Sequence, residues 1–142
     1  MTNHIHILAV PREQNSLAQG IGLTNLKYTK YFNHKHYRSG RIWQNRFYSS
    51  IVDTETHLWA VARYIENNPV KAGMTKTALD YRWSSVHHNV ADHIDTLLTQ
   101  ESWLEKGDQE DYSQFLTEEA PQTEEMIRKA TVGGRPICNT WN

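Results

Sequence analysis

The sequence predicts an α+β fold, in which helices pack on a small antiparallel sheet and a helical acidic tail follows. Residues 3–10 are rich in strand formers and end in turn chemistry at Pro11, and residues 41–52 are also strand-like. Apolar residues recur at helical spacing over residues 16–36 and again over residues 55–68. We therefore expect two helices to cover a sheet of short strands.

The charged residues divide the chain into a basic body and an acidic tail. Residues 1–90 carry 11 Lys and Arg against 5 Asp and Glu, whereas residues 91–142 carry 4 against 11. We expect residues 1–90 to form the main domain and residues 91–142 to form a tail of short helices at about 95–106, 113–116 and 124–130. A basic body suits nucleic-acid binding, although an ordinary solvated surface would give the same composition.

Composition also limits the cellular setting. No apolar run approaches the roughly 20 residues of a membrane span, and the first residues do not resemble a signal peptide. The single cysteine, Cys138, rules out an internal disulfide framework and suits a reducing compartment. We expect a cytoplasmic, nucleoid-associated protein that does not bind membranes.

Two histidines on the first predicted strand form a candidate metal site. His4 and His6 are two residues apart, so on a strand their side chains point to the same face. Two neighbouring neutral imidazoles can ligate one divalent ion. The alternative is a pair of strand histidines at a sheet edge, with no metal.

A tyrosine and an amide lie at the end of the second predicted helix. Tyr64 and Asn68 are four residues apart, so their side chains are neighbours on one face. Tyr64 could attack a phosphorus atom and form a covalent phosphodiester, while the Asn68 oxygen could be a third metal ligand. Alternatively, Tyr64 is a buried helix tyrosine and Asn68 a helix-terminal residue before Pro69.

Cations interleaved with aromatic residues suggest contacts to a DNA strand. Arg41 and Arg46 lie among aromatic residues in the segment 41–52, and Lys27 and Lys30 lie in the basic half of the first helix. Cations would bind phosphates and rings would stack on bases. A half-buried strand and a solvated helix face are the alternatives.

Four motifs, in this order along the chain, resemble the REP-associated tyrosine transposases of the single-tyrosine HUH superfamily, where HUH means His-hydrophobe-His. They are MTNHIHIL at 1–8, RSGRIWQNRFYSS at 38–50, RYIENNPVKAGM at 63–74 and YRWSS at 81–85. The resemblance therefore runs from residue 1 to about residue 90, and the tail from Ile127 to Trp141 resembles the usual end of the family. It implies a ferredoxin-like, RRM-like domain that cuts single-stranded DNA beside hairpins and rejoins it through a 5′-phosphotyrosine.

The resemblance also implies a role for each candidate residue. Tyr64 would be the nucleophile, and His4, His6 and Asn68 would bind Mg²⁺ or Mn²⁺, with softer metals also suited to these ligands. We add Arg63 to the candidate phosphate contacts because of its charge and its position beside Tyr64.

The sequence departs from the family pattern in two places. Thr2 stands where the motif usually has proline, and the strand, helix and strand that normally precede the His pair are not in this sequence. We expect a sheet with an open edge, in a monomer or in a homodimer that completes the sheet by strand exchange. Three functions stay open: an active nickase, a DNA-binding remnant that cannot cut, and a small α+β protein whose motifs are structural.

Overall fold

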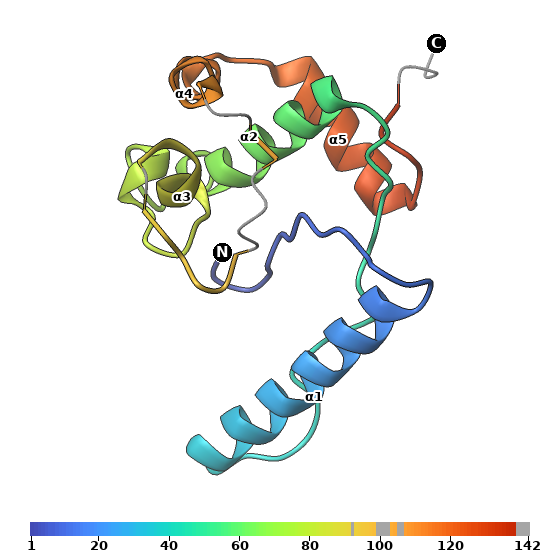
Figure 1. The fold of residues 1–142 in the computed structure, drawn as a ribbon. Helices are drawn as coiled ribbons and strands as arrows, with labels where there is room; N and C mark the ends of the chain where they lie inside the picture. The colour runs from blue at the N-terminus through green and yellow to red at the C-terminus, as the bar shows by residue number, and fades with distance from the viewer. Residues whose placement is uncertain (92, 99–102, 105–106, 139–142) are drawn as a thin grey trace. The chain divides into compact units, whose positions relative to one another are not determined.

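The computed structural model describes residues 1–91, 93–98, 103–104 and 107–138. Its elements are all helical, and Figure 1 labels α1 to α5. They are α1 (Ser16–Lys35), α2 (Glu55–Lys71), the 3-10 helix η1 (Ala78–Asp80), α3 (Val86–Val90), α4 (Asp108–Thr117) and α5 (Pro121–Gly133). No helix in this described part of the chain is long and apolar enough to cross a bilayer.

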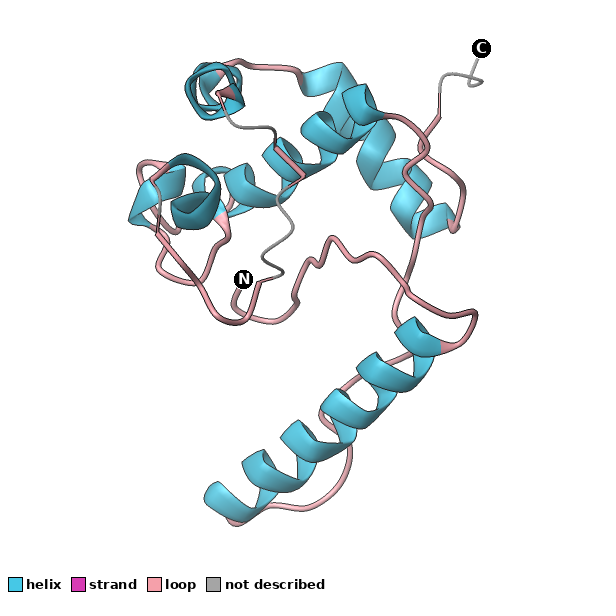
Figure 2. Ribbon diagram, in the orientation of Figure 1, coloured by secondary structure: helices cyan, strands magenta, loops and turns pink. Residues whose placement is uncertain are grey.

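The predicted antiparallel sheet is wrong. Within the described residues the β pairing is an isolated parallel bridge between Val52 and Ile137, and Figure 2 draws the chain as helices and loops. Residues 3–10 and 41–52 therefore do not form the expected strands. Strand propensity is realised only when a neighbouring strand takes up the backbone hydrogen bonds, and no described segment does so for residues 3–10.

The helical predictions are confirmed over most of the chain. Helix α1 matches the predicted residues 16–36, and the tail helices α4 and α5 cover the segments predicted at 113–116 and 124–130. The helix predicted at 95–106 is wrong where it can be checked, because residues 95–98 and 103–104 are not helical; the other residues of that range lie outside the described part of the chain.

Residues 7–48 form one compact unit, and α1 is its helix. None of the residues of this helix is buried. Its contacts with the rest of the unit are mainly aromatic. The Trp43 indole nitrogen donates a hydrogen bond to the Asn25 carbonyl oxygen (3.2 Å), and the Trp43 ring lies 5.9 Å from the Tyr28 ring. Segment 41–48 is thus anchored to α1 by Trp43 without forming a strand.

Residues 1–6 and 49–142 form the other compact unit, in which α2 is central. The Thr54 side chain caps α2 by accepting a hydrogen bond from the His57 backbone nitrogen (3.3 Å). The helix continues through Pro69 to Lys71, three residues beyond the predicted end. Gly73 follows the C-cap residue Ala72; it has a φ of +66°, and its backbone nitrogen donates a hydrogen bond to the Val70 carbonyl, which terminates the helix.

Two apolar clusters cover different sides of α2. On one side Ala62 packs with buried residues of the following segments, and on the other side Ala60 and Val61 pack against α5. The first cluster consists of Ala62, Ala78, Val86, Leu104, Tyr112 and Leu116. The second consists of Ala60, Val61, Ile127, Ala130 and Ile137. The segment expected to be a tail therefore supplies much of the core of this unit.

A buried carboxylate joins α2 to the segments around it. Glu66 is 1% exposed and accepts hydrogen bonds from the Ser85 hydroxyl (2.7 Å), the Asn89 amide (2.7 Å) and the Tyr112 hydroxyl (2.8 Å). Burial raises the pKa of Glu66, although the three hydrogen bonds favour its ionised form and oppose that shift. The network therefore ties α2 to α3 and α4 at one point.

Removing this acceptor should destabilise the fold. In Glu66→Leu the three donors would lose their partner, and we expect the free energy of unfolding to fall by about 3 kcal/mol or more. Glu66→Gln is the matched control, because its carbonyl still accepts and the Tyr112 hydroxyl can turn to accept from the new amide. Urea unfolding followed by tryptophan fluorescence measures both losses, and equal losses in the two variants would contradict this role.

The same carboxyl should make stability depend on pH. The folded pKa of Glu66 lies above its ordinary value of 4.5, so the folded protein binds a proton more readily than the unfolded chain. The contribution of Glu66 to the free energy of unfolding should therefore rise as pH falls from the folded pKa to about 4.5. Wild type should gain stability relative to Glu66→Gln over this range in urea titrations, and a constant difference would refute the shift.

Candidate active site

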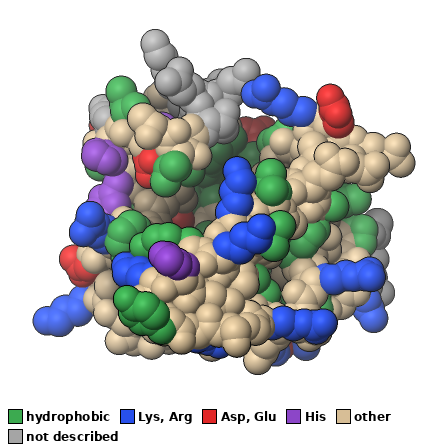
Figure 3. All heavy atoms as spheres, turned by 90° about the horizontal axis from the view of Figure 1, so that it is seen from below, with side chains coloured by type: hydrophobic (Ala, Val, Ile, Leu, Met, Phe, Trp, Pro, Cys, Tyr) green, Lys and Arg blue, Asp and Glu red, His purple; other side chains and the backbone are tan. Residues whose placement is uncertain are grey.

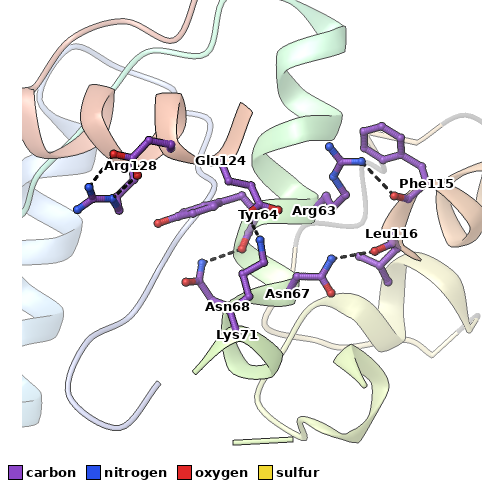
Figure 4. A network of polar contacts seen from close by, with 10 residues as sticks. Arg63, Tyr64, Asn67, Asn68, Lys71, Phe115, Leu116, Glu124 and Arg128 are labelled. Atoms are coloured by element: carbon purple, nitrogen blue, oxygen red, sulfur yellow. Dashed lines mark hydrogen bonds and ion pairs between the residues drawn. The ribbon is translucent and has the colours of Figure 1, made fainter. Parts of the chain in front are cut away.

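Tyr64 lies on the side of α2 that faces α5. Its half-buried ring packs against the cluster that contains Ile127 and Ala130 of α5. One turn later, the Asn68 side-chain nitrogen donates to the Tyr64 backbone carbonyl (2.7 Å), as Figure 4 shows. This hydrogen bond uses the amide nitrogen of Asn68, so the amide oxygen is the atom that could ligate a metal ion.

The structure brings the two histidines and Tyr64 together in the same compact unit. The His4 and His6 ring centroids are 5.0 Å apart, and the His6 and Tyr64 centroids are 5.7 Å apart. Both pairs meet edge to face, with interplanar angles of 84° and 83°. The His6 ring therefore contacts both the nearby His4 ring and the Tyr64 ring of α2, although residues 3–10 form no strand.

The nitrogen atoms of this histidine pair suit metal ligation. His4 Nδ1 is 2.7 Å from the Asn3 side-chain oxygen, so Nδ1 carries the proton of that bond and Nε2 keeps its lone pair. His6 Nε2 is buried and has no hydrogen-bond partner among the described residues. Burial, with smaller contributions from His4 and the N-terminal amine, lowers the pKa of His6 and favours the neutral, ligating form.

The spacing of the two rings is also compatible with a shared ion. A metal–nitrogen bond of about 2.1 Å places two imidazole centroids roughly 4.5 to 5.2 Å apart at the bond angles of a tetrahedral or octahedral ion. The observed 5.0 Å falls in that interval. The described residues contain no group of three or more His, Cys, Asp or Glu that could hold a metal, so an amide or solvent would have to complete this site.

The candidate phosphate contacts divide into one buried and four exposed residues. Arg63 is 4% exposed: its guanidinium lies 3.9 Å from the Phe115 ring centroid and donates to the Phe115 carbonyl (3.3 Å). In this structure Arg63 therefore joins α2 to α4 and is not accessible to a phosphate. The four exposed residues, all in the unit of residues 7–48, are Lys27, Lys30, Arg41 and Arg46.

Exposed cations and apolar side chains occur together on the protein surface. Figure 3 shows Lys and Arg side chains among hydrophobic ones on the face that it views. Tyr31 and Tyr48 are 57% and 64% exposed, so rings that could stack on bases accompany the exposed cations of this unit.

Polar residues of α5 lie beside Tyr64, and our sequence analysis did not identify them. Lys71 of α2 forms an ion pair with Glu124 of α5, and Arg128 one turn further along α5 is hydrogen-bonded to Glu125. Figure 4 shows the Tyr64 side chain extending from α2 toward Arg128. The spacing of Glu125 and Arg128 indicates a helical ion pair, but no local pattern links it to a tyrosine some 60 residues earlier.

Comparison with known proteins identifies the first half of the chain. Residues 1–68 match the family model described as "Transposase IS200 like". The first 68 residues are thus similar to IS200-like transposases. This confirms the family predicted from the sequence, and the match includes His4, His6, Tyr64 and Asn68. Helices α3, α4 and α5 lie outside the matched residues 1–68.

A curated relative supports the same family. The chain is 29% identical over 104 residues to a "Putative REP-associated tyrosine transposase" from Haemophilus influenzae. The alignment covers 66% of this chain and 59% of the relative, so the chain spans less than two thirds of that protein. No solved structure matches the chain significantly.

Proposed function

We propose that this IS200-like chain is a metal-dependent tyrosine transposase, an endonuclease that nicks and rejoins single-stranded hairpin DNA through a 5′-phosphotyrosine. The observation that carries the proposal is the contact of the His6 ring with both the His4 ring and the Tyr64 ring. The Tyr64 phenol packs against the His6 ring, which packs against the His4 ring, and this supports a nucleophile next to a metal site. The family match over residues 1–68 supports the same chemistry.

In the nicking step the Tyr64 oxygen attacks the phosphorus of a phosphodiester. The bond from phosphorus to the 3′ oxygen breaks as the bond to Tyr64 forms. The phenol proton is lost to solvent and the departing oxygen takes one up, so the products are a 5′-phosphotyrosine and a free 3′-OH. Rejoining is the same exchange in reverse, by attack of a 3′-OH on the phosphotyrosine.

His4, His6 and the Asn68 oxygen would hold a divalent ion such as Mg²⁺ or Mn²⁺. When bound, such an ion polarises the phosphate and offsets the charge that develops on its oxygens. The unpartnered His6 Nε2 and the His4 hydrogen bond to Asn3 support this assignment, because each leaves a nitrogen lone pair for a ligand.

The exposed cations of the unit of residues 7–48 would bind the DNA backbone. Lys27, Lys30, Arg41 and Arg46 offer four positive charges, and phosphate contacts of this kind dominate the affinity of proteins for DNA. Their part is to hold the strand, while the chemistry belongs to the unit that contains Tyr64. A cytoplasmic location with access to the nucleoid fits this substrate.

Incubation with hairpin-bearing single-stranded DNA and Mn²⁺ should give a covalent adduct that survives denaturing electrophoresis. Tyr64→Phe should abolish the adduct, because it keeps the ring packed beside His6 and removes only the hydroxyl. Tyr48→Phe, at an exposed tyrosine, is the matched control and should react like wild type. Binding of the DNA by wild type without any adduct would contradict the proposed enzyme and would leave the DNA-binding remnant as the function.

Replacing both His4 and His6 by alanine should lower Mn²⁺-stimulated cleavage by about 100-fold or more, since loss of even the outer partners of a metal site costs 10- to 100-fold. Affinity for the DNA should change little, because the exposed cations remain. The matched control replaces His34 and His36, in the unit of residues 7–48, by alanine, and its cleavage should stay close to that of wild type. Metal-stimulated cleavage at the wild-type rate in the His4, His6 variant would contradict the metal role.

A further inference from the structure

We propose that Arg128 of α5 binds the phosphate that Tyr64 attacks, with Glu125 holding its guanidinium in place. This inference rests on the proposed function and adds a residue outside the part of the chain that matches the family model. It assigns a phosphate-binding role to α5, a helix of the segment that we expected to be an acidic tail.

The placement of Arg128 follows from the packing of α2 on α5. The Tyr64 ring packs against the cluster that contains Ile127, the residue before Arg128. In Figure 4 the phenol extends from α2 toward the Arg128 guanidinium. The pKa of Arg128 is raised mainly by its hydrogen bond to Glu125 and by the charge of that carboxylate, and Tyr64 adds a smaller electrostatic contribution. The Tyr64 phenol and the Arg128 guanidinium therefore lie at the same contact between α2 and α5.

Glu125 fixes the orientation of the guanidinium. Arg128 Nε donates to one carboxylate oxygen of Glu125 (2.9 Å), and Arg128 Nη2 donates to the other (2.9 Å). Hydrogen bonding from Arg128 lowers the pKa of Glu125 to about 2, so this carboxylate stays ionised under all working conditions. A guanidinium has five N–H donors and Glu125 uses two, which leaves one donor on Nη2 and two on Nη1 for a phosphate.

A cation at this position would assist the transfer more than the binding. A phosphodiester carries one negative charge, and attack by the Tyr64 oxygen adds a second to the phosphoryl oxygens in the transition state. A pre-oriented guanidinium stabilises that added charge. The Arg128 and Glu125 side chains are 60% and 45% exposed, so DNA can reach them, and their mutual ion pair contributes little to folding.

Arg128→Gln should therefore slow adduct formation without unfolding the protein. At saturating hairpin-bearing single-stranded DNA and Mn²⁺, we expect the rate constant for the covalent adduct to fall by about 100-fold. Lys129→Gln is the matched control: it removes the same charge from the adjacent residue, which is also exposed and also paired with Glu125. Its rate should stay close to that of wild type, and equal rates in the two variants would overturn the inference.

A second measurement separates this inference from the proposed function. In Tyr64→Phe, which cannot react, the ¹⁵N resonance of Arg128 Nε should shift when the same DNA is added, and the Lys129 Nζ resonance should stay in place. If the DNA binds but the Arg128 resonance does not shift, the role of Arg128 is refuted. Adduct formation by Arg128→Gln at the wild-type rate would also refute it. Neither result would contradict the proposed function. If wild type forms no adduct, both the proposed function and the inference fail.

Discussion

The orientation of α2 depends on the burial of Glu66. Its carboxylate collects hydrogen bonds from Ser85, Asn89 and Tyr112, so rotating α2 would separate a buried charge from its donors. Residues two positions apart in a helix differ by about 200° around its axis. Tyr64 and Glu66 therefore lie on nearly opposite sides of α2. Anchoring Glu66 among α3 and α4 therefore directs Tyr64 to the other side, where α5 and the histidine pair lie.

The same constraint gives the acidic C-terminal segment its role. Helices α4 and α5 supply Tyr112, Leu116, Ile127 and Ala130 to the two clusters that enclose α2. Without them, Glu66 would lose one of its donors and Tyr64 would lose the apolar surface against which it packs. The excess of acidic residues in this segment is compatible with folding because its apolar residues recur at helical spacing and face α2.

Residue propensities and apolar spacing predicted most of the helices correctly and the antiparallel sheet wrongly. Thr54 and the apolar spacing after it specify α2 within a few residues, whereas Ile5 and Ile7 show strand propensity but find no partner strand among the described residues. The approach of Tyr64 to His6 was a hypothesis from the chemistry of these residues and from the family resemblance, because no local pattern connects residues so far apart. The burial of Arg63 and the position of Arg128 were unpredictable for the same reason: both depend on packing between α2 and later helices.

The most direct test of this account is to map the protein–DNA bond by mass spectrometry. Cleavage after Arg63 and Lys71 by trypsin releases a peptide of residues 64–71 that contains Tyr64 as its single tyrosine. We predict that this peptide carries the 5′-phosphoryl end of the cleaved strand, with a free 3′-OH on the released strand. DNA attached to any other peptide, or attached through its 3′ end, would contradict the account.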